Sequence, residues 1–436
     1  METKNWGIIG GGIMGMTLAH RLSQQGHKVT IFEAAPELGG LVSPWQMNGV
    51  EWDKFYHVIL LSDLRTRNIL KEIGLEEKIQ WVETKTGFYM NGSLYSMSDT
   101  IEFLKFPSLN LIDKFRLGLT IIVASKIKNY KRLEKIPVTK WLRRWSGSRT
   151  FNKIWLPLLR AKLGESYERT SAVFIWATIQ RLYGARRSGL KKEMFGYVPG
   201  GYKSVIQMFK QKLDEEGVLV KTACVAKEVK NSADNKPVIC FHDGTTQQFD
   251  EVIVTLPSGI AASLCKGLTE TEKQKLKNVE YLGVICVAVL LDKPISHFYV
   301  TNITDSWVPF TGVIEMSALV DKQNFGGHSL VYLPKYLSPD DPLFSQSDEH
   351  LRTYFLDNFK KMYPSFTDAN IKFAGVARAK HVITVAKLNY SDILPAVRTS
   401  MPGVSIINTS HIKDGTLNVN ETVRVAETKL EEILTP

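Results

Sequence analysis

A glycine-rich loop near the start of the chain is the feature that most constrains its fold. The loop stands between an apolar stretch, residues 6–9, and a segment, residues 13–25, whose apolar side chains recur at helical spacing. A second apolar stretch, residues 28–33, follows at once. Two short apolar runs around a helix predict a β-α-β unit, so the chain should contain an open, largely parallel sheet.

The loop has the pattern Gly10-x-Gly12-x-x-Gly15, and each of its glycines has a physical task in binding a dinucleotide. The first permits the tight turn, the second lets backbone N–H groups approach a pyrophosphate, and the third lets the helix pack closely on the strand. Glu33 can accept hydrogen bonds from ribose hydroxyls. Phosphate should lie at the helix N-terminus, where unpaired N–H groups favour anions. The predicted dinucleotide site therefore comprises Gly10, Gly12, Ile13, Met14, Gly15 and Glu33, and a purely structural glycine turn is the alternative.

A second glycine pair distinguishes between the two common dinucleotides. Gly39 and Gly40 stand in the segment Glu33-Ala-Ala-Pro-Glu-Leu-Gly-Gly-Leu-Val-Ser. This segment resembles the extended FAD motif of the glutathione-reductase-like flavoproteins, in particular the branch of amine oxidases, protoporphyrinogen oxidases and phytoene desaturases. The resemblance implies FAD rather than NAD, with Gly39, Gly40 and Leu41 close to the cofactor.

The resemblance continues through most of the chain. Residues 197–202 look like the turn that opens the substrate-side segment, and residues 252–257 look like the strand that closes the FAD domain. Val225 stands where this family returns a strand to the adenine. Residues 402–420 take the place of the C-terminal flavin motif, which implies cofactor contacts from Asn408, Asp414, Val419 and Asn420.

The C-terminal motif differs from the family pattern at one point, and the resemblance gives the helix that follows it a mechanistic role. Asn408-Thr409 replaces the family's usual Gly-Asp, and an amide can bind a phosphate or ribitol group but cannot act as a carboxylate. The helix that follows should direct its N-terminus at the flavin, where N–H groups stabilise the negative charge of the reduced ring.

The expected fold class is α/β. It combines a Rossmann-like FAD-binding domain assembled from discontinuous segments with a substrate domain made of a mixed β-sheet and α-helices. The length also favours two joined domains. The expected division is residues 1–62, 196–260 and 376–436 for the FAD domain, 63–195 for a helical basic section, and 261–375 for the substrate sheet.

Two observations narrow the chemistry within this family. No cysteine follows Cys286, which excludes the covalent attachment found in monoamine oxidases and predicts non-covalent FAD. Residues 281–287 offer no lysine where amine oxidases commonly place one facing flavin N5, so amine oxidation is disfavoured. The sequence thus favours an FAD-dependent oxidase, dehydrogenase or desaturase that transfers a hydride from a small, hydrophobic substrate to flavin N5.

The sequence offers few candidates for the reacting side. His57 follows the glycine pair at the interval where this superfamily, including UDP-galactopyranose mutase, brings a histidine alongside the flavin. It could orient substrate or move a proton, and a structural role is the alternative. Glu315, Tyr332 and Arg398 are candidates for lining a substrate cavity.

Two other functions remain open at this point. A non-redox flavoenzyme resembling UDP-galactopyranose mutase would act on a nucleotide sugar, and the arginines available for its phosphates are Arg160, Arg181, Arg378 and Arg398. A non-catalytic flavin-binding module is the other alternative.

The net charge of +11 is concentrated in one part of the chain. Residues 105–162 hold 15 lysines and arginines but only two acids, Asp113 and Glu134. A basic block interleaved with Trp, Phe and Leu favours either peripheral contact with an anionic membrane surface or a solvated helical face. Nucleic acid is not expected, because no recognised binding motif accompanies the charge.

The cysteine spacing and the first residues of the sequence indicate the cellular compartment that we expect. Cys224, Cys240, Cys265 and Cys286 lie far apart with no metal-ligand spacing, which predicts no metal site and fits a reducing compartment. With neither a signal peptide nor a spanning segment visible, we expect a cytoplasmic protein, peripheral on the inner membrane face if it binds lipid. The sequence leaves the oligomeric state open.

Overall fold

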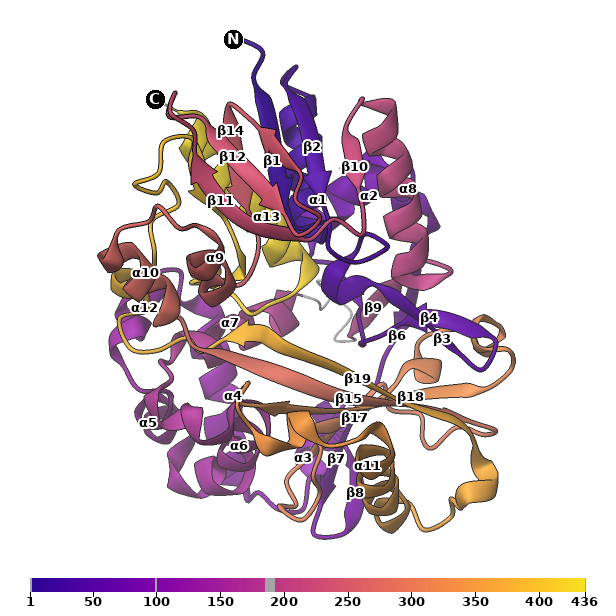
Figure 1. Cartoon of the computed structure of the whole chain (residues 1–436). Coiled ribbons are helices and arrows are strands. Elements are labelled where there is room, and N and C mark those ends of the chain that lie inside the picture. Colours follow the sequence, from indigo (N-terminus) through magenta and orange to yellow (C-terminus); the bar gives the residue numbers. More distant parts are fainter. Residues whose placement is uncertain (1, 99, 185–192, 436) are drawn as a thin grey trace.

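The computed structural model describes residues 2–98, 100–184 and 193–435. Figure 1 shows two sheets of different kinds, one beside the two chain termini and one crossing the middle of the molecule. Helices of the section that follows α2 gather at the end of the molecule remote from the termini.

A five-stranded parallel sheet is built from both ends of the chain. Its strand order is β10-β2-β1-β14-β20, with every neighbouring pair parallel. This arrangement confirms the α/β class and the Rossmann-like domain made of discontinuous segments. The strands are β1 (Asn5–Ile9), β2 (Lys28–Phe32), β10 (Leu219–Lys221), β14 (Glu251–Val254) and β20 (Val404–Ile406).

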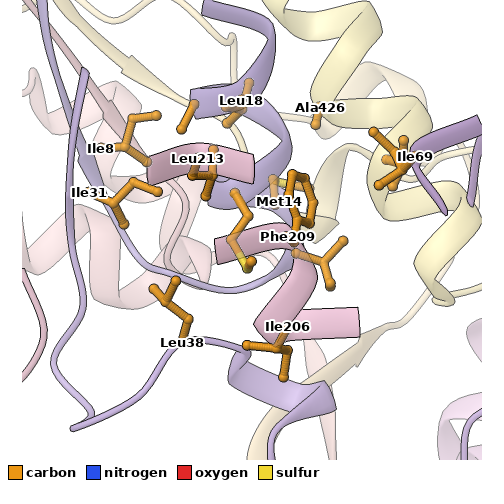
Figure 2. Close-up of a cluster of buried hydrophobic side chains, with 14 of the residues drawn as sticks. Ile8, Met14, Leu18, Ile31, Leu38, Ile69, Ile206, Phe209, Leu213 and Ala426 are labelled. Carbon is orange, nitrogen blue, oxygen red and sulfur yellow. The ribbon is translucent and has the colours of Figure 1, made fainter. Parts of the chain in front are cut away.

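Helices cover one face of the parallel sheet. Figure 2 shows Met14 and Leu18 meeting Phe209 and Leu213, in the same cluster as Ile8 of the central strand. All five side chains are buried, and truncating the largest, Phe209, to alanine should cost about 3–5 kcal/mol. The helices of this layer are α1 (Ile13–Ser23), α2 (Leu64–Glu72), α8 (Gly201–Glu215) and α13 (Val419–Leu434).

A small antiparallel sheet covers the other face. Side chains of a strand alternate between faces, so Ile9 and Phe32 point away from the helices and pack with Phe241 and Phe249. The strands of this sheet are β11 (Ala226–Asn231), β12 (Pro237–Phe241) and β13 (Thr246–Gln248). Two helices, α9 (Ser258–Leu264) and α10 (Glu270–Lys277), follow β14.

The second main sheet has seven strands and is mixed. Its order is β19-β15-β18-β17-β16-β7-β8, and only the β16–β7 pair is parallel. β15 is buried along its whole length, because α11 (Asp348–Met362) covers one face and residues 45–60 pack on the other. The strands are β7 (Thr86–Met90), β8 (Ser93–Ser96), β15 (Tyr281–Leu291), β16 (Val300–Ile303), β17 (Gly312–Glu315), β18 (Ser329–Leu337) and β19 (Ile371–Thr384).

Short strands join the two main sheets. A hairpin of β3 (Pro44–Met47) and β4 (Val50–Asp53) follows the second glycine pair. A three-stranded sheet pairs β9 (Met194–Tyr197) with β5 (Ile59–Leu60) and β6 (Gln80–Glu83). These strands carry the chain between the parallel sheet and the mixed one.

The basic section forms a helical layer with its own core around Trp141, Phe151 and Trp176. Its helices are α3 (Thr100–Lys105), α4 (Leu111–Lys126), α5 (Val138–Thr150), α6 (Leu156–Leu163) and α7 (Val173–Gly184), and a short α12 (Tyr390–Ile393) lies nearer the C-terminus. No helix of the described chain is both long and apolar enough to cross a bilayer.

Candidate functional site

The first glycine loop packs α1 directly against β1. Gly10 has φ +110°, a conformation that side chains disfavour, and its N–H donates to Phe32 O at 2.8 Å. A Cβ on Gly15 would lie 1.9 Å from Gly10 O. Both glycines are therefore required by the protein itself, and they hold the N-terminus of α1 at the carboxyl end of β1.

Gly12 is different, because nothing in the protein requires a glycine there. Its φ of −74° suits any residue, and a Cβ would meet no protein atom nearer than Gly39 O at 3.9 Å. The N–H of Met14 in the first turn of α1 has no acceptor among the described residues, and that of Ile13 has only the bridge to the Gly39 loop. Open space beside an unpaired N–H group at a helix N-terminus fits an anionic group such as a pyrophosphate.

The second glycine pair lies against the first loop. Gly39 N donates to Gly11 O at 2.9 Å, and Gly39 and Gly40 have φ values of +124° and +57°. A Cβ on Gly40 would lie 3.3 Å from Gly12 Cα. The pair therefore lets two loops approach as closely as their backbones allow, and Leu41 continues the turn in a short 3-10 helix.

Glu33 closes β2 beside both loops. Its Oε2 accepts from Gly11 N at 2.6 Å and its Oε1 from Ala35 N at 2.8 Å. Its backbone O accepts from Cys224 N at 2.8 Å, which places Val225 at this edge with a side chain that is 44% exposed. A fixed carboxylate beside an exposed apolar side chain suits the ribose and adenine of a dinucleotide.

A second helix N-terminus lies at the same edge of the sheet. β20 is parallel to β14 and β1, so α13, which follows β20, begins at the edge where α1 begins. Asn418 caps α13 by accepting from Glu421 N at 3.0 Å. The N–H groups of Val419 and Asn420 have no acceptor among the described residues. The Asn420 side chain instead caps α2, accepting from Arg65 N at 2.9 Å.

The side chains of Asn408 and Asp414, the other two predicted residues of the C-terminal motif, bond to groups of the protein itself. Asn408 is buried, accepts from Ser410 Oγ at 2.7 Å, and donates to Leu256 O at 2.8 Å. Asp414 pairs with Arg424 of α13 at 2.5 Å. Both side chains fix the connection that leads into α13, and their contact with a cofactor stays a prediction.

His57 lies at the junction between the two main sheets. Its Nδ1 is 3.6 Å from Asp53 Oδ2, and its ring packs edge-on against Tyr202. Burial raises the pKa of Asp53, whose Oδ1 accepts from Tyr202 N at 2.9 Å. Beside these residues lies a cavity of about 10 Å³, room for roughly one water.

Each of the three predicted substrate residues is held by contacts within the protein, and Glu315 and Tyr332 lie on the paired strands β17 and β18. Glu315 accepts from Ser296 N at 2.9 Å and from Ile295 N at 3.1 Å, and burial raises its pKa to about 7. Tyr332 donates to Asp53 O at 2.5 Å. Arg398 donates to Ile433 O near the end of α13. Their observed contacts are structural, and their role in lining a substrate cavity stays a prediction.

Two features of the site escaped sequence reasoning. The bond from Gly11 to Glu33 makes the acid part of the loop, and the sequence shows only the spacing between them. The hydroxyls of Tyr56 and Tyr336 lie 2.8 Å apart, and Lys162 Nζ lies 3.6 Å from the Tyr336 ring centroid. Burial raises the pKa of Tyr56, so its hydroxyl stays protonated. No local signal links residues 280 positions apart.

The glycine loops, Glu33 beside them and the two helix N-termini define a protein with a Rossmann-like dinucleotide site. The chain belongs to the family of flavin containing amine oxidoreductases, whose family model matches residues 13–380. It is an FAD-dependent oxidoreductase, as the resemblance implied.

Two curated relatives agree with this assignment, and a solved structure shares the fold. The chain is 21% identical over 411 residues to the 15-cis-phytoene desaturase of Capsicum annuum, covering 88% of this chain and 69% of the relative. It is 21% identical over 425 residues to a zeta-carotene desaturase of Synechocystis sp., covering 85% of each. The structure of reduced UDP-galactopyranose mutase has the same fold, with a TM-score of 0.75 at 15% identity over 99% of this chain and 96% of that one.

Proposed function

We propose that this protein oxidises or desaturates a small hydrophobic molecule. When bound, FAD supplies the acceptor for the hydride that leaves the substrate. The observation that carries the proposal is the pair of helix N-termini, α1 and α13, that meet one edge of the parallel sheet with N–H groups of their first turns unpaired in the described structure.

The chain's own residues divide the work of holding the cofactor. Met14, beside Ile13, would donate a backbone N–H bond to the pyrophosphate, and Glu33 would accept from the ribose. Val419 and Asn420 would place the positive end of α13 against the flavin, where it favours added negative charge. These contacts use backbone groups, so their strength depends on geometry rather than on ionisable side chains.

An apolar substrate suits the residues on the other side of the site. The mixed sheet turns Cys286, Ala288, Ile314 and Tyr332 toward the segment that carries His57, and all four are buried. Two relatives are named for the desaturation of phytoene and of zeta-carotene, which are apolar molecules. His57 and the paired hydroxyls of Tyr56 and Tyr336 are the polar groups available to orient such a substrate.

The nucleotide-sugar alternative would need cations that converge on a diphosphate. The four candidate arginines instead have separate protein contacts. They are Arg160, beside Glu165 and Tyr167, Arg181, bonded to Asp63, Arg378, paired with Asp348, and Arg398, bonded to Ile433 O. This dispersal favours the oxidoreductase over a mutase.

Anaerobic reduction of the purified holoprotein tests the proposal. Apolar polyenes, porphyrinogens and amines would be added in turn, with UDP-galactose as the polar comparison, while the flavin absorbance is followed. We expect an apolar compound alone to bleach the flavin, with an oxidised product recovered in equal amount. Turnover of UDP-galactose only after prior chemical reduction would overturn the proposal in favour of the mutase, and failure with every donor would favour a binding module.

A further inference from the structure

Helix α4 turns an apolar face to the solvent. Its buried side is formed by Asp113, Leu117, Thr120 and Ala124, as the helical period requires. The opposite side carries, in place of the usual polar residues, five large apolar side chains. They are Leu111 (74% exposed), Ile112 (70%), Phe115 (72%), Leu119 (37%) and Ile122 (54%).

These exposed side chains form one contiguous ridge and are not scattered singly over the surface. They recur at intervals of one, three and four along α4, so they share one side of the helix. Leu104, at the end of α3, adds a sixth exposed apolar side chain close by. Leu111, Ile112 and Phe115 are the three most exposed large apolar side chains of the described chain. A contiguous apolar surface of this kind marks an interaction site.

Exposed cations surround this ridge. Lys105 stands before it, and Lys126 and Lys128 stand at its far end. Arg149 reaches the first turn of α4, 3.4 Å from Asp113, and Lys153 Nζ donates to Ser108 O, just before that turn. The same helical layer exposes Lys131, Arg132, Lys135, Lys140, Arg143 and Arg144.

The two acidic residues of this section are buried and do not contribute to its surface. Asp113 is buried and shares a capping box with Asn110 at the start of α4. Glu134 is buried and accepts from Ser391 Oγ at 2.7 Å. Among residues 105–162, the surface therefore presents cations around an apolar ridge, without an exposed carboxylate.

We propose that the α4 ridge, residues 104–122, docks this protein on an anionic lipid bilayer. Apolar side chains on a helix lying in the interface enter the acyl boundary, while the flanking lysines and arginines meet lipid phosphates. Figure 1 places α4 with α5 and α6 at the end remote from the termini, so docking leaves the parallel sheet free. The inference does not depend on the proposed reaction.

Charge argues against the other occupants. A second copy of this chain would bring the same cations face to face across a two-fold axis, and like charges repel. Nucleic acid would meet the cations but leave Phe115 and its apolar neighbours without a partner. An anionic bilayer satisfies both parts of the surface at once.

Co-sedimentation of the holoprotein with lipid vesicles tests the proposal. We expect binding to phosphatidylcholine vesicles that contain phosphatidylglycerol, weak binding to pure phosphatidylcholine, and release as salt rises well above about 0.1 M. The Ile112→Asp, Phe115→Asp double variant should bind at least about tenfold more weakly. Because both side chains are exposed, the variant should keep its FAD spectrum and melting temperature.

Two controls make the result decisive. Leu219→Asp, on the remote strand β10, changes an equally apolar side chain that is 60% exposed and should leave vesicle binding unchanged. Lys126→Glu with Lys128→Glu should weaken binding to anionic vesicles alone. Equal binding by wild type and the double α4 variant would overturn the proposal. A dimer of the wild-type chain that the α4 variant dissociates would also overturn it.

Discussion

Gly12 has an ordinary backbone conformation and open space at its missing Cβ, so only a bound group explains why a side chain is absent there. Gly12→Ala should therefore weaken FAD binding by about tenfold or more, equivalent to ~1.4 kcal/mol, since the methyl group fills the pyrophosphate position. The apoprotein should be as stable as wild type or gain about 0.4–1 kcal/mol, because alanine restricts the unfolded chain. Flavin fluorescence titration and thermal unfolding of the apoprotein measure the two effects.

Gly15→Ala is the matched control, because the same methyl group there would meet Gly10 O at 1.9 Å. This variant should lose stability with or without FAD. If Gly12→Ala bound FAD like wild type, the pyrophosphate would not lie beside Gly12.

Glu315 should make stability depend on pH. Burial raises its folded pKa from 4.5 to about 7, so its contribution is fully present below pH 4.5 and is lost as the pH rises through 7. We therefore compare the unfolding free energy of wild type with that of the Glu315→Gln variant. The wild-type value minus the variant value should fall as the pH rises through this window, by ~1.4 kcal/mol for each unit by which the Glu315 pKa is shifted. Burial lowers the pKa of His411 to about 4, which gives an opposite slope common to both proteins. Denaturant unfolding of both proteins at several pH values measures this difference. Stability-against-pH curves that run parallel for the two proteins would contradict the prediction.

At the scale of the elements, regular patterns in the sequence predicted structure well. The first β-α-β unit has the expected position, because two apolar runs around a segment of helical period are local signals. The section of residues 63–195 is predicted to be helical, yet β6, β7 and β8 lie within it. The turn between β7 and β8 is Asn91-Gly92, with φ values of +52° and +74°, a hairpin signal that the helical interpretation overlooked.

The N-cap of α13 should matter twice, once for the helix and once for the cofactor. Asn418→Ala removes the acceptor for Glu421 N, which should cost about 1 kcal/mol of stability. It should also weaken FAD binding, because the first turn of α13 would no longer hold its N–H groups in place. Thr269→Ala removes the equivalent cap of α10 and should cost a similar amount without changing FAD binding. Equal FAD affinity in both variants would place the flavin away from α13.

At the scale of the whole molecule, the sequence could assign each segment to a class but not show which side chains meet. The glycine loops were recognisable because backbone geometry restricts those positions to glycine. The contacts of Glu315, Tyr332 and Arg398 could not be read from local patterns, because their partners come from other segments of the chain. Local patterns therefore located the glycine loops, and only the fold shows that α13 begins at the same edge of the sheet.

Because α1 and α13 begin at the same edge of the parallel sheet, we expect FAD binding to affect distant parts of the chain together. If one FAD molecule bridges α1 and α13, adding it should slow hydrogen exchange together at residues 10–16, 38–42 and 418–422, although 400 residues or more separate the first segment from the last. At a free FAD concentration 100 times Kd, binding should also stabilise the fold by about 2.7 kcal/mol. The α4 ridge, residues 104–122, should show no change, since it lies on the remote helical layer. Exchange measured by mass spectrometry with and without FAD separates the outcomes. Protection confined to residues 10–16 would mean that the dinucleotide contacts α1 alone, and the role given to α13 would have to be abandoned.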